Sequence, residues 1–169
     1  PVRAVAVENT NRAAQNINGD DLLPGAFAKI YVLDYQPAVL ADIKFNQKPT
    51  FTGIFQTVAL ADAEFEGLEN NFAVEVTGYL NIPKTNNYVF RLLCDDGAML
   101  WIDDKLTVEY DGLHGADPRD GELSLEAGLH PFKIQYFQAG GGKVLRLEWS
   151  SPDIGEFQTV PATVFKHAK

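Results

Sequence analysis

Apolar and polar residues alternate in several short runs of the chain. Apolar residues occupy every second position in 88–92, 106–110, 132–136 and 145–149, with mostly polar residues between them. A period of two places successive side chains on opposite faces of a strand, so each run predicts a strand with one buried and one solvated face. Strands of this kind are typical of antiparallel sheets.

Nine such runs are separated by clusters of Pro, Gly, Asn and Asp. The predicted strands are 27–33, 55–60, 72–81, 87–93, 98–103, 106–110, 122–126, 129–138 and 143–149. Many short strands between turn residues favour an all-β fold, an antiparallel β-sandwich or barrel with few or short helices. Between Gln36 and Asn46 we expect a short helix or an irregular crossing, with Pro37 in its first turn.

Residues 1–24 lack this periodicity, and we expect an N-terminal arm or linker there, followed by one β domain over 25–169. The chain opens on Pro1 without an initiator Met, which is consistent with a processed protein or a piece of a longer one. No apolar run approaches the roughly 20 residues that span a bilayer, so we expect no membrane insertion.

The chain is acidic, with a formal net charge of −9. Nucleic-acid binding needs a basic footprint, so DNA and RNA are not expected partners. Ten of the 23 acidic residues lie between Asp95 and Glu126, where Lys105 and Arg119 are the only Lys or Arg. The negative potential of this region favours attraction of a cation.

Asp95, Asp96 and Gly97 stand between two predicted strands and therefore at a turn. Asp and Gly are common turn residues, so a structural turn explains them in part. Two adjacent carboxylates repel each other, and four arrangements offset this: full solvation, a nearby base such as Arg91, a proton retained on one acid, or a hard cation such as Ca²⁺.

The remaining reactive side chains point less clearly to chemistry. Cys94 is the only cysteine, which excludes an internal disulfide and favours a buried, inert thiol. Trp101 and Trp149 alternate within strands and are expected in the core. The loop 111–121 is expected to be a solvated connector with internal Asp–Arg pairing, in which His114 either lines a cleft or binds a backbone carbonyl. No catalytic motif is present, and we expect a protein that is not an enzyme.

Several segments, taken in order, resemble the PA14 domain, a β-rich module of anthrax protective antigen, bacterial glycosidases, toxins and fungal adhesins. The matching segments are 76–83, 88–92, 95–103, 125–130, 134–137 and 145–149, and 25–31 resembles the opening strand of the module. Asn86 and Asp104 replace glycines that the family favours in two turns. Both residue types tolerate a left-handed backbone, so both turns are expected to form.

The resemblance implies a site. In sugar-binding members the paired aspartates are joined by a cis peptide and hold Ca²⁺, which assigns Asp95 and Asp96 as metal ligands. A second loop and sugar hydroxyls complete the coordination shell of the ion, and the corresponding loop of this chain is 138–143. Its candidate ligand-binding residues, to which we add the loop residue His114, are Gln138, Gly140, Gly141, Gly142 and Lys143. Adhesins typically place an Asn in this loop, and this chain offers backbone carbonyls and a lysine.

We therefore expect a non-catalytic, Ca²⁺-dependent, lectin-like carbohydrate-binding module of a larger secreted or cell-surface protein, extracellular or periplasmic, with a role such as adhesion. Its partners would be a glycan or polysaccharide and other domains of the same polypeptide. The alternative is a structural or protein-interaction PA14 module that packs against a catalytic domain without binding sugar. An autonomous glycoside hydrolase is disfavoured because no pair of carboxylates stands out as acid and nucleophile.

Overall fold

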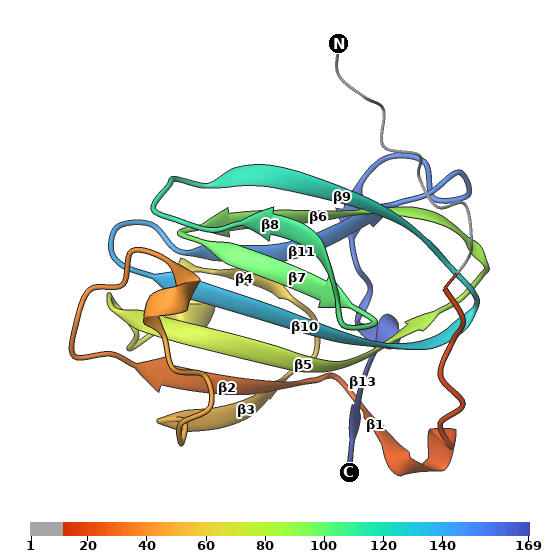
Figure 1. The fold of residues 1–169 in the computed structure, drawn as a ribbon, viewed down its shortest axis with the longest axis horizontal. Helices are drawn as coiled ribbons and strands as arrows, with labels where there is room; N and C mark the ends of the chain where they lie inside the picture. The colour runs from red at the N-terminus through yellow and green to blue at the C-terminus, as the bar shows by residue number, and fades with distance from the viewer. Residues whose placement is uncertain (1–11) are drawn as a thin grey trace.

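A computed structural model describes residues 12–169 as two antiparallel sheets packed against each other (Figure 1). The eight-stranded sheet has the order β1-β13-β5-β10-β7-β8, with β2 paired to both β5 and β3. The five-stranded sheet has the order β12-β11-β6-β9, with β4 also paired to β11. The expected all-β antiparallel sandwich is confirmed. Among the described residues, none of the helices has the length and apolar character of a membrane span.

The strand bounds follow the alternating runs closely in the middle of the chain. The eight-stranded sheet contains β1 (Leu22–Pro24), β2 (Ala26–Val32), β3 (Phe51–Phe55), β5 (Phe72–Ile82), β7 (Ala98–Ile102), β8 (Lys105–Tyr110), β10 (Gly128–Gln138) and β13 (Phe165–Ala168). The five-stranded sheet contains β4 (Ala59–Ala61), β6 (Asn86–Asp95), β9 (Asp117–Leu125), β11 (Val144–Ser150) and β12 (Gln158–Thr159). Short 3₁₀ helices are η1 (Gly19–Asp21), η2 (Leu40–Asp42), η3 (Asp62–Phe65) and η4 (Ala162–Val164).

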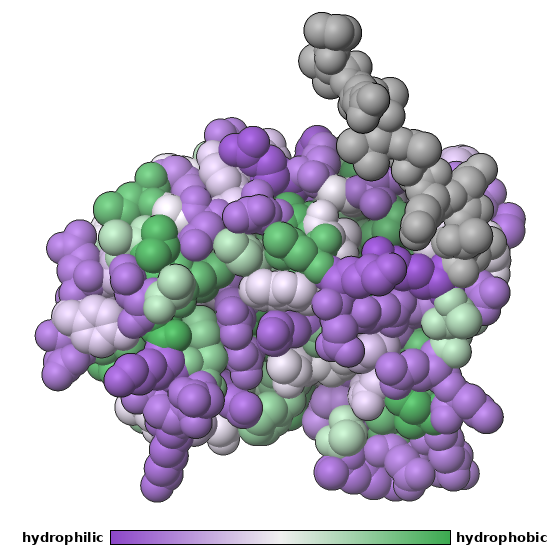
Figure 2. All heavy atoms as spheres, in the orientation of Figure 1, coloured by the Kyte–Doolittle hydropathy of each residue, from purple (hydrophilic) through white to green (hydrophobic). Residues whose placement is uncertain are grey.

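The main core lies between the two sheets and is built from the inward-facing residues of each strand. Trp149 on β11 is buried there and stacks on Tyr88 of β6, as its alternation predicts. Polar side chains cover most of the face shown in Figure 2, with apolar ones showing between them. Burial of the apolar faces between the sheets is therefore the main source of stability.

The predicted strand 55–60 is wrong. β3 ends at Phe55 in the eight-stranded sheet, and β4 begins at Ala59 in the five-stranded sheet. The residues between them carry the chain from one sheet to the other, and Val58 is fully buried on the way. Its carbonyl accepts a hydrogen bond from Leu147 of β11. An apolar crossing of this kind has the same local pattern as a strand.

The loop expected over 111–121 is shorter than predicted, because β9 begins at Asp117 and pairs with β6. Pro118 fits there because β9 is an edge strand of its sheet, where a missing N–H is tolerated. The expected Asp–Arg pairing within this loop is also wrong. Asp120 pairs with Arg91 of β6, and the Arg119 guanidinium lies over the ring of Tyr110.

The segment between β2 and β3 is an irregular crossing that contains the short helix η2. The expected place of Pro37 in the first helical turn is wrong, because η2 begins only at Leu40. The segment covers a second, smaller apolar cluster on the face of the eight-stranded sheet that points away from the main core. The members of this cluster are Tyr31, Leu33, Leu40, Ile43, Ala73, Phe137 and Ala139. The outer face of the sheet is thus covered at the end where β2 leaves it.

The turn between β7 and β8 has Asp103 and Asp104 in the left-handed region, with φ of 52° and 60°. The expectation for Asp104 is confirmed, and two successive left-handed residues match the tight turns that suit β-hairpins. The turn before β6 also forms, over residues 83–85. Asn86 itself is the first residue of β6 and is absent from the residues with positive φ, so this turn does not use a left-handed backbone at Asn86.

Candidate functional site

Asp95 is the last residue of β6, and Asp96 and Gly97 connect it to β7. The peptide bond between the two aspartates is cis, as the family resemblance implies. The loops that follow β2, β8 and β10 lie at the same end of the sandwich, on the left in Figure 1. The fold therefore gathers segments distant in sequence around the paired acids.

Asp96 is buried and holds two of these loops through its carboxylate. Its Oδ2 accepts a hydrogen bond from the backbone N–H of Ala139 at 2.8 Å, and its Oδ1 accepts one from the N–H of His114 at 3.3 Å. Hydrogen bonds to an ionised acceptor are stronger than neutral ones. Asp96 thus links the 111–116 loop to the start of the 138–143 loop.

Asp95 has a different environment, because its carboxylate accepts no hydrogen bond and forms no ion pair with any of residues 12–169. Burial raises the pKa of the Asp95 carboxyl above its ordinary value, the charge of Asp96 adds to the rise, and His114 acts in the opposite direction. The backbone carbonyl of Asp95 accepts a 2.6 Å hydrogen bond from the hydroxyl of Tyr136.

Arg91 does not neutralise the acidic pair. Its guanidinium binds both carboxylate oxygens of Asp120, at 2.7 Å from Nε and 2.9 Å from an Nη. This bidentate contact raises the pKa of Arg91. No base within residues 12–169 therefore pairs with Asp95, and of the other arrangements considered, solvation, a retained proton or a cation can offset its charge.

Gln138 and the glycines after it form the second loop, which the structure brings beside the acidic pair. The Gln138 side chain is buried, and its Nε2 donates to the carbonyl of Gly141 at 3.2 Å, so it shapes the loop from within. The Cα of Gly142 faces Asp95, because a methyl group built there would lie 3.4 Å from Asp95 Oδ2. Gly140 faces the side chain of Asn70 instead.

Lys143 and His114 are held by protein groups. The Lys143 ammonium donates to the carbonyl of Leu68 at 3.1 Å and lies 3.7 Å from a carboxylate oxygen of Glu69. The His114 ring stacks on Tyr110 at 3.6 Å between centroids, and its two nitrogens lie 2.8 and 3.1 Å from backbone carbonyl oxygens. Of the two roles considered for His114, the observed contacts match the binding of backbone carbonyls.

Three residues of the site were missed by sequence reasoning. Asp62 accepts a hydrogen bond from the backbone N–H of Lys143, and Asp111 accepts one from the N–H of Leu40. Asn71 precedes β5, whose first residue pairs with Gln138, and its buried Oδ1 has no hydrogen-bond partner within the described chain. The pairing of β5 with β10 could have pointed to Asn71, whereas no local pattern marks Asp62 or Asp111.

The oxygen-rich character of the site fits a hard cation such as Ca²⁺, which takes six to eight oxygen ligands. Asp95 offers an unpaired carboxylate, and Asp96 retains lone pairs beyond its two hydrogen bonds. Asn71 offers an amide oxygen without a partner in the described chain, and it precedes the β5 residue that pairs with Gln138. Over residues 12–169, however, no cluster of three or more His, Cys, Asp or Glu is arranged to hold a metal. Carboxylates alone thus leave the coordination incomplete, and main-chain or ligand oxygens would have to complete it.

Cys94 lies beside this site but is buried, as expected. Burial raises the pKa of its thiol to about 12, and the charge of Asp95 contributes. The thiolate is the reactive form of cysteine, so Cys94 is inert at neutral pH.

Comparisons with known proteins give a consistent picture of the family. The PA14 domain model matches residues 57–162. The anti-sigma-I factor RsgI3 of Acetivibrio thermocellus is 29% identical over 84 residues, which are 49% of this chain and 13% of that protein. An anti-sigma factor domain-containing protein from Clostridium clariflavum superposes with a TM-score of 0.70 at 25% identity, over 87% of this chain and 48% of that one. The chain thus spans less than half the length of these relatives.

A PA14 sugar-binding domain from an RTX adhesin superposes with a TM-score of 0.73 at 20% identity, over 86% of this chain and 99% of that domain. None of these three proteins is named as an enzyme. The family model covers well over half of the chain, and the similar structures share its two-sheet fold. The chain belongs to the PA14 domain family.

Proposed function

We propose that this chain is a Ca²⁺-dependent carbohydrate-binding module of a larger protein that acts outside the cell or at its surface. The observation that carries the proposal is the adjacent pair of Asp95 and Asp96 at the loop end of the sandwich, where the Asp95 carboxylate has no hydrogen bond and no basic partner among residues 12–169. The similarity to a sugar-binding domain of an adhesin supports the choice of ligand. Bound Ca²⁺ would supply positive charge to offset the two carboxylates and coordinate vicinal hydroxyls of the sugar.

The residues of this chain would divide the work at the site. Asp95 and Asp96 would hold the ion, and Asp96 would also keep the 111–116 and 138–143 loops in place through its two backbone hydrogen bonds. The glycines of the second loop would let the sugar approach the carboxylate of Asp95, because Gly142 presents only its backbone there. A small polar contact of this kind gives modest affinity per site.

A glycan array with the wild-type chain, in millimolar Ca²⁺ and in EDTA, tests this proposal. We expect binding to at least one glycan that EDTA abolishes and that the isosteric double variant Asp95→Asn/Asp96→Asn lacks. Asp20→Asn/Asp21→Asn is a control, because it removes the same charge from another pair of adjacent aspartates, which lies exposed outside the site. Glycan binding that is identical with and without Ca²⁺, or no binding at all, would contradict the proposal.

A second candidate is an interaction module within a regulatory protein, without sugar binding. It is favoured by the relatives that are named as anti-sigma factor proteins, of which this chain would form only one part. In that case the acidic pair has a structural role, and neither Ca²⁺ nor any glycan changes the melting temperature of the wild type or of Asp95→Asn/Asp96→Asn. A rise in melting temperature with Ca²⁺ alone would show only that the ion stabilises the module, whereas binding of a glycan that EDTA abolishes would exclude this candidate.

A further inference from the structure

Residues 12–169 leave the outer face of the eight-stranded sheet open at the end far from Asp95 and Asp96. Strand register sets side chains on this face in rows across β2, β5 and β10. The first row, Tyr31, Ala73 and Phe137, lies under the segment between β2 and β3. The next row is Lys29, Glu75 and Gln135, and its members bind one another through an ion pair and a hydrogen bond.

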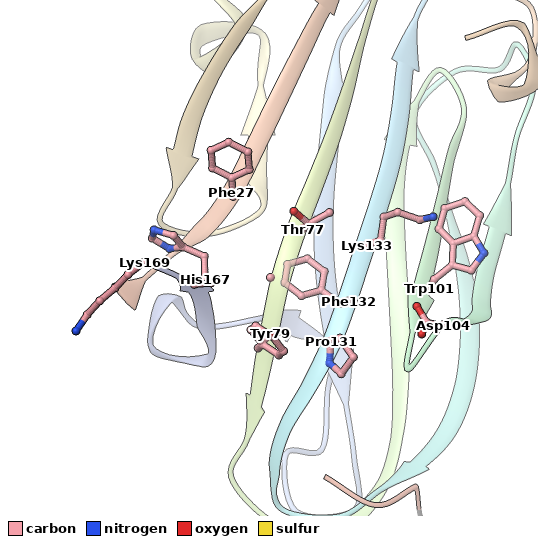
Figure 3. Close-up of a pocket in the computed structure, with 12 residues that line it drawn as sticks. Phe27, Thr77, Tyr79, Trp101, Asp104, Pro131, Phe132, Lys133, His167 and Lys169 are labelled. Carbon is pink, nitrogen blue, oxygen red and sulfur yellow. The ribbon is translucent and has the colours of Figure 1, made fainter. Parts of the chain in front are cut away.

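The third row, which runs over four strands, is different because it contains two aromatic rings. Register places Phe27 opposite Thr77, Thr77 opposite Lys133, and Lys133 opposite Trp101 of β7. Tyr79 and Pro131 follow in the next row. These residues line an open pocket of about 620 Å³, which is within the usual size of small-ligand sites (Figure 3).

Trp101 is expected in the core from its alternation, and this prediction is wrong. Leu100 and Ile102 are fully buried, so Trp101 between them faces the opposite side of the sheet and is only half-buried. The pairing of β7 with β8 also shifts register between Leu100 and Trp101. Such irregularities re-aim side chains and are frequent beside functional sites.

The polar groups of this pocket have few protein partners. The Lys133 ammonium lies 4.5 Å from the centroid of the Trp101 ring, and it forms no ion pair with the described residues. Figure 3 shows the Lys133 side chain pointing toward Trp101. The Asp104 carboxylate and the hydroxyls of Thr77 and Tyr79 likewise form no hydrogen bond within residues 12–169. The pocket therefore combines aromatic faces with a basic, an acidic and two hydroxyl groups that remain available to a ligand.

We propose that this pocket is a second carbohydrate site, which does not depend on Ca²⁺. The ligand class rests on the proposed carbohydrate-binding function. A sugar ring presents an apolar C–H face and a rim of hydroxyls, which match the face of Trp101 and the free polar groups of Lys133 and Asp104. The third row spans about 14 Å across four strands, so it suits a chain of sugar rings rather than a single ring.

The pocket is separate from the acidic pair. Trp101 of β7 lies five positions after Asp96 along the chain, and at about 3.3 Å per residue this separates the two by about 17 Å. The β7–β8 turn with Asp104 lies at the other end of β7 from Asp96 in Figure 1. One protein could thus contact the same polysaccharide at two places, which raises the overall affinity when both sites are engaged.

Affinity electrophoresis in EDTA tests the second site without a contribution from Ca²⁺. The probes are hydroxyethyl cellulose, xyloglucan, galactomannan and polygalacturonate, which offer neutral and acidic chains. We expect the wild type and Asp95→Asn/Asp96→Asn to be retarded alike by at least one of them, and Trp101→Ala or Tyr79→Ala to bind about tenfold more weakly. Phe51→Ala is the matched control, because Phe51 is an exposed aromatic of the same sheet outside the pocket.

Tryptophan fluorescence provides a readout that does not require a disruptive substitution. The chain has two tryptophans, and Trp149 is buried in the core, so a polysaccharide that binds the pocket should change the emission of Trp101. The change should be seen in the wild type and be absent in Trp101→Phe, whose melting temperature shows whether it is folded.

Three results would overturn the second site: no retardation of the wild type by any probe in EDTA, retardation that Trp101→Ala and Tyr79→Ala leave intact, or a dimer in sedimentation that only these two variants dissociate. The outcome is independent of the first proposal. If the wild type shows binding that depends on Trp101 but none that depends on Ca²⁺, the first site alone is refuted. If it shows binding that depends on Ca²⁺ but none that depends on Trp101, the second site alone is refuted.

Discussion

Asp96 shows, at the scale of one residue, how a single carboxylate holds together two loops that are distant in sequence. Its two oxygens accept the N–H groups of Ala139 and His114. An alanine at this position would leave both donors without a partner, and the Ala139 donor is buried. An unpaired buried donor costs about 1–3 kcal/mol.

Asp96→Ala should therefore lower the free energy of unfolding by about 2 kcal/mol in EDTA, as measured by urea denaturation. Asp96→Asn keeps one acceptor and should lose less. Asp34→Ala is the control, because Asp34 is an exposed aspartate with no hydrogen bond among the described residues and no positive φ, and it should lose almost nothing. Equal stability of Asp96→Ala and Asp34→Ala would show that the two backbone hydrogen bonds do not hold the loops.

The same residue scale shows what sequence reasoning could reach at the site. Asp95 and Asp96 are visible because they are adjacent, acidic and placed between two alternating runs. The roles of Gln138 and Lys143 were not visible, because the partners of their side chains come from the loop's own backbone and from the segment before β5. Contacts of this kind depend on the three-dimensional path of the chain, which no local pattern records.

At the scale of elements, the alternation of apolar and polar residues predicted the strands that have one buried and one exposed face. It missed strands whose two faces are similarly exposed or that are very short. β6, β10 and β11 have one buried and one wetter face and were found nearly to the residue. β13 has only four residues, and the first four residues of β9 are all exposed. Neither carries a period-two signal of apolar residues, so both were missed in whole or in part.

Gly121 marks the place where β8 crosses close to β9. A methyl group built on its Cα would overlap the carbonyl oxygen of Thr107 on β8, and backbone cannot move aside as a flexible side chain can. Gly121→Ala should therefore reduce the free energy of unfolding by about 1–3 kcal/mol.

The matched control for this substitution is Gly53→Ala, which changes a strand glycine with no heavy atom within 4 Å of the added methyl. It should leave the midpoint of urea unfolding unchanged or slightly raised, because alanine reduces the entropy of the unfolded chain. If both variants unfold at the same urea concentration, the close approach of β8 to Gly121 is not a constraint on the fold.

At the scale of the whole molecule, the two proposed sites lie on one rigid body that buries its apolar surface between two sheets. The sheets bring the loops around Asp95 to one end, and they leave the pocket around Trp101 on an outer face. The site at the loop end is formed by loops that hydrogen bonds to Asp96 hold in place, whereas the pocket is formed by strand residues whose positions the strand register sets. Loss of loop order should therefore weaken the first site and leave the second intact.

The N-terminal boundary of the domain is open to a direct test at this scale. Sequence reasoning placed an arm or linker over 1–24, and in the described part of it several residues contact the sandwich. The guanidinium of Arg12 donates to the carbonyl of Ile102, and the backbone N–H of Gln15 donates to Leu129. β1 then pairs with β13, with Leu23 opposite His167. Removal of these residues would also expose the backbone edge of β13, and exposed edges promote association.

A chain that begins at residue 25 should therefore be less stable than one that begins at residue 12. Four backbone hydrogen bonds outside the strands join residues 12–24 to the rest of the chain, and at about 1 kcal/mol each they predict a loss of about 4 kcal/mol, to which the lost β1–β13 pairing adds. Urea denaturation of the two chains measures the difference, and gel filtration shows whether the shorter one associates. The longer chain is the control, because it keeps the contacts of Arg12 and Gln15. Identical unfolding curves would place the boundary at residue 25 and make 12–24 a linker; a difference of the expected size would make those residues part of the PA14 domain itself.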